Sequence, residues 1–284
     1  MTTIRSPHTF RGGIHPAYNK ELAAGAAIRG NAIGVAGNGI AALPNAQGGI
    51  QVVGAPNAII GGAALDQGNH VAGNQGNGIL LVEADGAVLT QNRVGVLWHG
   101  FDKLANGICG ILLSNSAQCV IGPDNLIGGN GSDGIRLSGP SSANNTIVSN
   151  LIGTAAFNGN NLGNNGDGVH LRGGDRNWTI GGNIIARNFG NGIAIYTGAR
   201  NYASGNRIYL NAMKSIHVSQ EGDPQPNMGI RPALLTNVVV SGARVQGTVT
   251  GAPASGEAQL ECFYASDTNA FGAFAHTYMG LGTV

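Results

Sequence analysis

A short signal, Gly-Ile after a turn residue, recurs along this chain and constrains its fold more than any other feature. Successive copies lie from 23 residues apart (193 to 216) to 34 residues apart (135 to 169). Self-similarity at such a period is typical of proteins built from stacked coils. The apolar members of the copies are Ile50, Ile79, Ile111, Ile135, Val169, Ile193 and Ile216.

Each repeat also carries a second group, in which an Asn is followed by Ile within three residues, as at Asn57, Asn145 and Asn177. Such short apolar runs, split by Gly and Asn, predict short parallel strands around a coil rather than hairpins. Gly and Asn tolerate a left-handed backbone at least cost, which we take as the reason that they dominate the corners. The longer gaps predict loops near 85–107 and 154–165 at one corner.

The composition of the chain limits the classes of function that it can have. The 284 residues include 49 Gly, 42% are apolar and only 10% are charged, so an aliphatic core can form. A net charge of +1 gives no general electrostatic case for nucleic acid or an anionic membrane. No apolar run predicts membrane insertion, and no signal peptide is visible. The three cysteines form no C-x-x-C pair, so we expect no structural metal site.

The repeats divide the chain into four regions. Residues 1–29 precede them and predict a leader or cap, and residues 30–220 carry the coils. Residues 221–235 break the pattern with Pro and Gly and predict an exit linker. Residues 236–284 alternate like exposed antiparallel strands, which predicts the start of a β-sandwich-like module. The pattern stops in its middle, so we expect this module to be truncated.

Residues from about 30 to 235 resemble bacterial right-handed parallel β-helix repeat proteins with the pectate-lyase-like architecture. The residues that carry the resemblance are the Asn-Gly-Ile and Asp-Gly-Ile signals and the exit Asn-Met-Gly-Ile-Arg-Pro-Ala-Leu. The resemblance implies an all-β chain, namely a right-handed parallel β-helix followed by the start of a β-sandwich-like module. It also implies an extracellular or cell-surface location. It does not fix an activity, because one fold hosts lyases, hydrolases, adhesins and non-catalytic surface repeats.

Residues 9–22 show a different likeness. Thr9-Phe-Arg-Gly-Gly-Ile-His-Pro, with Asn19-Lys-Glu-Leu, is similar to the N-terminal segment of the RnfC protein of the Rnf electron-transport complex. The iron–sulfur chemistry of that family needs clustered cysteines, which this chain lacks. We therefore carry no function over from this segment.

A cluster of polar residues is expected on the outside of the later coils. Side chains alternate along a strand, so residues one and three after each inward apolar position point outward. In the earlier coils these outward positions hold uncharged residues, and some of them are apolar. In the later coils they are predicted to gather a ligand-binding set on a chain that is poor in charge. The set is Arg136, His170, Arg172, Tyr196 and His217.

Two carboxylates stand at the start of the strands in this cluster. If Asp133 and Asp167 stack about 4.8 Å apart, their repulsion would raise the pKa of one of them. That arrangement would supply an acid and a base, with Arg172 as the third catalytic residue, and carboxyls about 5 Å apart favour a retaining glycosidase. The alternative is a turn role alone, because Asn77 and Asn191 occupy the same place in other copies.

Family motifs count against catalysis. The β-helix polygalacturonases carry Asn-Thr-Asp, Asp-Asp, His-Gly and Arg-Ile-Lys signals in succession, and this chain lacks that set. Two carboxylates are few for the calcium site of a pectate lyase, because calcium takes six to eight oxygens. Residues 128–136 fit the calcium-binding nonapeptide once, whereas that motif works in tandem copies. We expect no cofactor, and calcium is the one ion that the motif leaves open.

Two functions therefore remain. The first is a non-catalytic surface repeat protein that binds a polysaccharide or a cell-surface glycan. The second is a polysaccharide lyase or glycoside hydrolase that acts on acidic polysaccharides. The few carboxylates and the missing motifs favour the first.

Overall fold

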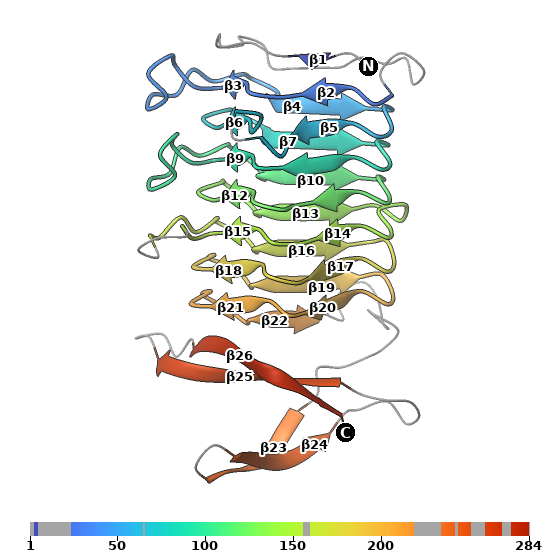
Figure 1. Cartoon of the computed structure of the whole chain (residues 1–284), viewed down its shortest axis with the longest axis vertical. Helices are drawn as coiled ribbons and strands as arrows, with labels where there is room; N and C mark the ends of the chain where they lie inside the picture. Colours follow the sequence, from blue (N-terminus) through green and yellow to red (C-terminus); the bar gives the residue numbers. More distant parts are fainter. Residues whose placement is uncertain are drawn as a thin grey trace.

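The chain folds into stacked coils made of three parallel sheets, in a computed structural model (Figure 1). The structure describes residues 24–64, 66–155 and 160–218, together with the backbone of strands at 3–4, 234–241, 244–250, 259–268 and 274–283. These residues contain strands and turns and no helix. None of them forms a helix of the length and apolar character that crossing a membrane requires. The all-β prediction is confirmed.

Each coil visits the three sheets in the same order, beginning with a sheet of seven strands that we call the long-strand sheet. Its strands are β4 (Gly48–Val53), β7 (Asn77–Val82), β10 (Ile111–Ser114), β13 (Ile135–Ser138), β16 (Val169–Arg172), β19 (Ile193–Thr197) and β22 (Ile216–Val218). The chain then enters the eight-stranded sheet, of β1 (Thr3–Ile4), β2 (Ala27–Ile28), β5 (Ile59–Gly61), β8 (Val88–Thr90), β11 (Val120–Ile121), β14 (Thr146–Ile147), β17 (Trp178–Ile180) and β20 (Tyr202–Ser204).

The third side of each coil is the short-strand sheet. Its strands are β3 (Ala32–Ile33), β6 (His70–Val71), β9 (Arg93–Val94), β12 (Leu126–Ile127), β15 (Leu151–Ile152), β18 (Ile184–Ala186) and β21 (Arg207–Tyr209). Every pairing within the three sheets is parallel. Such pairing requires a crossover between successive strands, and here the rest of the coil provides it.

The core is a set of aliphatic rows that run through the stack. The apolar members of the Gly-Ile signals pair in register from β4 to β22, as predicted. From Ile50 to Ile193 they are 0–1% exposed, whereas Ile216 in the last coil is 38% exposed. Interior residues two positions later on the same strands, such as Leu81 and Leu137, form a second buried row. Each coil therefore buries its interior mainly against its neighbours.

The glycine of the Gly-Ile signal is required by close packing rather than by a left-handed backbone. A Cβ on Gly110 would lie 2.7 Å from the carbonyl oxygen of Gly134 in the next coil, and also 2.7 Å from the Asn130 side chain. A Cβ on Gly134 would meet the carbonyl oxygen of Gly168 in the same way. These contacts are too short for any side chain, so the signal marks the approach of one coil to the next.

Most corner asparagines also have a different role from the one predicted. They point inward and are buried, and each carboxamide oxygen accepts hydrogen bonds from the Asn of an adjacent coil. Only a few corner Asn residues, such as Asn57 and Asn144, have the left-handed backbone. One continuous ladder precedes the long-strand sheet, and we call it the asparagine ladder. Its members are Asn45, Asn74, Asn106, Asn130, Asn164, Asn188 and Asn211.

The extra residues of the longer coils form short hairpins that leave one corner. Isolated antiparallel bridges join Val96 to Lys103 and Thr154 to Asn161. A third bridge, between Val35 and Ala42, places a hairpin in the first coil that sequence analysis missed. These hairpins come after β3, β9 and β15, and so alternate with coils that have none.

Two antiparallel pairs follow the coils. β23 (Leu234–Ser241) pairs with β24 (Arg244–Thr250), and β25 (Gln259–Thr268) pairs with β26 (Phe274–Thr283). The alternating strands expected after residue 236 are therefore present, and the sandwich-like packing stays a prediction. Most of the leader, including residues 9–22, and most of the exit linker lie outside the described residues.

Candidate functional site

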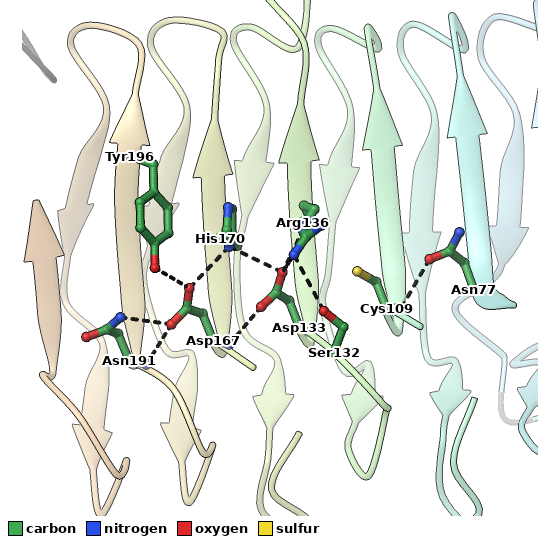
Figure 2. A network of polar contacts seen from close by, with 9 residues as sticks. All are labelled: Asn77, Cys109, Ser132, Asp133, Arg136, Asp167, His170, Asn191 and Tyr196. Carbon is green, nitrogen blue, oxygen red and sulfur yellow. Dashed lines mark hydrogen bonds and ion pairs between the residues drawn. The ribbon is translucent and has the colours of Figure 1, made fainter. Parts of the chain in front are cut away.

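The two aspartates of the predicted site lie where the chain enters the long-strand sheet, two residues before the apolar residue of a Gly-Ile signal. The side chains at this position form a column across successive coils, which we call the entry column. Within it, the Asn77 oxygen accepts the main-chain N–H of Cys109 (3.1 Å) (Figure 2). The Asn191 oxygen accepts the main-chain N–H of Lys214 (3.1 Å). Gly48 occupies this position in β4 and has no side chain. The members of the entry column are Asn77, Cys109, Asp133, Asp167, Asn191 and Lys214.

Asp133 and Asp167 each use one carboxylate oxygen to accept a main-chain N–H of the next coil in the same way. Asp133 Oδ1 accepts the main-chain N–H of Asp167 (2.8 Å), and Asp167 Oδ1 accepts that of Asn191 (2.7 Å). The side chain of Asn191 donates a further bond to Asp167 Oδ1 (2.9 Å). The predicted turn role is therefore present in the hydrogen bonds. This role uses only Oδ1, one of the two oxygens of each carboxylate.

The second oxygens face a buried network of charged groups (Figure 2). Asp133 Oδ2 accepts a hydrogen bond from Arg136 Nε (2.6 Å). His170 Nδ1 lies between the carboxylates, 3.3 Å from Asp133 Oδ2 and 3.1 Å from Asp167 Oδ2. Both carboxylates are buried, with Asp133 3% and Asp167 5% exposed. A cost of burying two like charges is thus offset by a guanidinium and an imidazole.

His170 lies beside Arg136 on the outer side of the sheet, as the alternation predicts, and it is buried there. Its Nδ1 is within ion-pair distance of both aspartates but lacks the alignment of a hydrogen bond, and its Nε2 has no hydrogen-bond partner. Burial alone would lower the pKa of His170, but the contacts with Asp133 and Asp167 outweigh it and raise the pKa above its ordinary value. The imidazole therefore favours the protonated form, which balances the two carboxylates.

The electrostatics of Asp167 differ from the like-charge prediction. Burial alone would raise the pKa of Asp167, but the contact with His170 and the hydrogen bonds from Asn191 outweigh it and lower the pKa. The pKa of Arg136 is raised, because Asp133 outweighs the effect of burial. The expected repulsion does not raise the pKa of Asp167, since His170 lies between the two carboxylates.

Tyr196 occupies a different place from the predicted one. Arg172 pairs with Thr197 across a register shift, which leaves Tyr196 as an extra residue in β19. The Tyr196 ring lies 4.4 Å from the His170 ring and 5.8 Å from the His217 ring, measured between centroids. Its hydroxyl donates a hydrogen bond to Asp167 Oδ2 (3.2 Å). The bulge thus brings Tyr196 over the network, and His217 joins it through the ring contact.

Arg172 is not brought into this network. It is exposed, and within the described residues its guanidinium has no ion-pair partner. It lines a shallow groove of about 650 Å³ at the far end of the same strands, where the chain turns toward the eight-stranded sheet. The other residues that line this groove are Ser138, Gly139, Pro140, Gly173, Gly174, Asp175, Thr197 and Gly198.

Three groups of the network have a spacing that a metal ion could use. One ligand atom each from Asp133, Asp167 and His170 lies within 4.8 Å of the others. The Arg136 guanidinium already holds Asp133 Oδ2, and a cation would have to displace it or tolerate its charge. Asp133 also belongs to the nonapeptide of residues 128–136, so the same guanidinium competes with calcium there. These residues therefore fit a metal ion poorly.

Sequence analysis missed two partners in the network. Asn191 binds Asp167 with both its main chain and its side chain, and Ser132 Oγ lies 3.5 Å from Arg136. The signal for Asn191 was in the sequence, since it occupies the same entry-column position as the two aspartates. Ser132 is adjacent to Asp133 but has no pattern that distinguishes it.

Comparisons with known proteins agree with this architecture. A family model described as "Right handed beta helix region" matches residues 100–228. Two mutant structures of the periplasmic alginate epimerase AlgG are similar, with TM-scores of 0.50 and 0.52 at 18% and 17% sequence identity. Each alignment covers 72% of this chain and 41% of the epimerase chain, so this chain spans less than half of those structures. No curated protein matches the sequence.

Identities below one fifth carry information about the fold and not about the activity. The family model, the three parallel sheets and the alignments with AlgG agree on that fold. The chain is a right-handed parallel β-helix.

Proposed function

We propose that the outer face of the long-strand sheet, in its later coils, binds an acidic polysaccharide without cleaving it. The observation that carries the proposal is the commitment of both carboxylates. One oxygen of each holds the next coil, and the other holds Arg136 or His170 in a buried network. A general acid or nucleophile must reach the substrate, whereas the side chains of Asp133 and Asp167 are only 4% and 7% exposed.

The groups that remain for a ligand are those at the surface. Arg172 is exposed at the rim of the groove, and a guanidinium makes two-pronged hydrogen bonds to a carboxylate such as that of a uronic acid. Tyr196 is half-buried, and its ring is held in place by Asp167 and His170 beneath it. A ring fixed in this way presents a sugar-stacking surface at little entropic cost. His217 lies beside it.

Acidic polysaccharides are also the class that the comparisons suggest for a first test. The similar structures are of a periplasmic enzyme named for alginate, which is a polymer of uronic acids. On this proposal the partner is a polysaccharide or cell-surface glycan, and the protein works outside the cytoplasm or at the cell surface. No metal or other cofactor takes part in binding.

A second candidate, a lyase or hydrolase of acidic polysaccharides, is favoured by one contact. The Tyr196 hydroxyl is bonded to Asp167 and its ring lies tilted against the His170 ring, so a proton could pass between a bound sugar and this group. In that case Tyr196 would be the residue that touches the substrate. Asp167 and His170 would set its protonation state.

The experiment that tests the proposal measures binding and chemistry on the same samples. Calorimetric titration with polygalacturonate and with alginate is expected to show binding that Arg172→Ala weakens by about tenfold. Arg207→Ala is the matched control, because Arg207 is exposed as well but lies on the short-strand sheet. Its affinity is expected to equal that of the wild type.

The same mixtures are then assayed for products. We expect no unsaturated ends, no new reducing ends and no change in uronate stereochemistry. Products that disappear in Tyr196→Phe would establish the second candidate instead. Absence of binding to either polymer, or equal loss in the Arg172 and Arg207 variants, would refute the proposed site.

A further inference from the structure

We propose that a second polysaccharide-binding surface lies on the eight-stranded sheet, separate from the site above. Its ligand is a polysaccharide that bears carboxylates. The surface is formed by two exposed aromatic rings and two exposed guanidiniums in neighbouring coils. We call it the aromatic–arginine surface, and its residues are Arg176, Trp178, Arg200 and Tyr202.

The two aromatic residues occupy the same position on neighbouring strands. Trp178 begins β17, Tyr202 begins β20, and the two are partners in the parallel register. Neighbouring strands lie about 4.8 Å apart, so the two side chains are adjacent on the outer face. Trp178 is 50% exposed and Tyr202 is 45% exposed. Large aromatic groups left in water side by side indicate an interaction surface rather than a packing requirement.

The earlier coils show that the fold does not need aromatic residues here. The equivalent positions on the preceding strands are Val88, Val120 and Thr146, all half-buried. These smaller residues complete the same parallel register. The change to Trp and Tyr is confined to the last two strands of the eight-stranded sheet.

The two arginines occupy the same turn position in neighbouring coils. Each stands two residues before the paired aromatic, with a left-handed backbone (φ 54° at Arg176 and 55° at Arg200). The equivalent residues in earlier coils are Asn57, Gly86, Gln118 and Asn144. Asn and Gly adopt this conformation readily, and Gln118 shows that the turn also accepts a long polar side chain. The change in the last two coils is therefore the positive charge.

Within the described residues, neither Arg176 nor Arg200 has an ion-pair partner. Both are exposed. Guanidiniums that no described carboxylate of the chain neutralises can bind carboxylates of a ligand, and they do so with two parallel hydrogen bonds.

The charge of the chain is also divided along its length. Residues 24–171 contain four basic and seven acidic residues, whereas residues 172–214 contain six basic residues and one acidic residue, Asp175. The overall charge of +1 hides this division, because it averages over the whole chain. A basic segment attracts an anionic polymer and raises its local concentration. The basic residues of the segment 172–214 are Arg172, Arg176, Arg187, Arg200, Arg207 and Lys214.

A carboxylated polysaccharide fits these features better than a nucleic acid does. Sugar rings stack on aromatic side chains, and the carboxylates of successive sugars would meet Arg176 and Arg200. A single-stranded nucleic acid requires a basic groove that follows its phosphates over several nucleotides. Here the described basic residues of the surface are two arginines beside two rings, on the outside of a sheet.

The chain contains only two tryptophans, which permits a local test. In the variant Trp98→Phe, Trp178 is the only fluorescent indole, and it lies on the proposed surface. In the variant Trp178→Phe, Trp98 is the only one. Trp98 is the control, because it is exposed as well (57%) and has Arg93 5.2 Å from its ring, but it lies on the hairpin after β9.

The experiment titrates each variant with polygalacturonate and follows indole emission and its quenching by acrylamide. We expect Trp178 to become protected from acrylamide and Trp98 to remain unprotected. The double variant Arg176→Ala/Arg200→Ala, made in the Trp98→Phe background, is expected to bind about tenfold more weakly by the Trp178 signal. Circular dichroism of each variant confirms that the coils are intact.

Three results would overturn the proposal. They are an unchanged Trp178 signal at saturating polymer, an equal response to neutral dextran, and an equal or larger response to polyuridylate. Arg172→Ala separates this surface from the first one. Retention of the Trp178 response in that variant supports two independent surfaces, and its loss would mean that the ligand is held only through the groove.

Discussion

Two columns of side chains cross the same turn of the coil, three residues apart, and they differ in a way that separates fold from function. The asparagine ladder repeats Asn in every coil from Asn45 to Asn211. The entry column makes similar bonds to the next coil but varies among Asn, Cys, Asp and Lys. A uniform column satisfies one requirement shared by all coils. The entry column, which we also call the variable column, must therefore meet a further requirement that differs from coil to coil.

Asn77 and Asn191 show that an amide is enough for the bond to the next coil. An aspartate in the same place adds a charge, and burying a charge is costly unless it is paired. At Asp133 and Asp167 the added oxygen pairs with Arg136 and His170, and Tyr196 is bonded above them. We infer from this difference that the aspartates serve the charged network on the outer face, because the turn alone would need only an amide.

The largest effect is expected in the uniform column. Asn130→Ala removes hydrogen bonds to the coils on both sides, so Asn106 Nδ2 and Asn164 Oδ1 each lose one of their buried hydrogen bonds. Each such loss costs roughly 1–3 kcal/mol, so we expect the free energy of unfolding to fall by about 3 kcal/mol. Urea denaturation followed by circular dichroism measures it. A change smaller than that of Asp133→Asn would mean that the ladder does not hold the coils together.

A smaller effect is expected in the variable column, and it should depend on which atom is lost. Asp167→Ala removes both oxygens, whereas Asp167→Asn keeps the oxygen that accepts from Asn191. We expect the alanine variant to be about 2 kcal/mol less stable than the asparagine variant. Denaturation curves of the two variants give this difference directly. Equal stability would show that the bond to Asn191 contributes nothing.

The pH dependence of stability should come from the variable column as well. The folded-state pKa of His170 is raised, so its stabilisation is complete below the unfolded pKa of about 6.5 and is lost as pH rises through the folded pKa. We therefore expect the free energy of unfolding to decline between about pH 6 and pH 8 more in the wild type than in His170→Asn. Identical slopes for the two proteins would contradict the assignment.

The smallest effect is expected where the variable column lacks a good acceptor. Cys109 stands between Asn77 and Asp133 in that column, and a thiol accepts hydrogen bonds weakly. Cys109→Asn would restore an amide oxygen to face the Asp133 N–H. We expect a stabilisation of about 0.5–1 kcal/mol, measured by denaturation. Loss of stability would mean that the site at Cys109 has no room for the amide.

Much of the fold could be predicted from sequence because one residue recurs per coil. The spacing of the Gly-Ile copies placed Ile79, Ile111 and Ile135 in one buried row, and the structure has them there. The reason for the glycine was not predictable, because it lies in a contact with the next coil that only stacking creates. The inward asparagines were misjudged for the same reason.

The sequence predicted which residues belong to the site better than it predicted how they are arranged. Alternation along the strands brought Arg136 and His170 together, as their pairing confirms. Alternation failed at Tyr196, because a single extra residue in β19 shifts the register after Ile195. Burial of His170 also escaped prediction, since it depends on a ring that the bulge places over it. The roles of Arg172 and His217 in binding stay predictions.

The central claim is that Asp133 and Asp167 hold a charged His170 between them. Nuclear magnetic resonance of the imidazole, assigned by comparison with His170→Asn, measures the pKa of this histidine directly. In the wild type we predict a pKa above the ordinary value, and in Asp133→Asn/Asp167→Asn we predict that it falls, because the two acceptors of its charge are gone while burial remains. A His170 pKa that is the same in both proteins, or below the ordinary value in the wild type, would contradict the account.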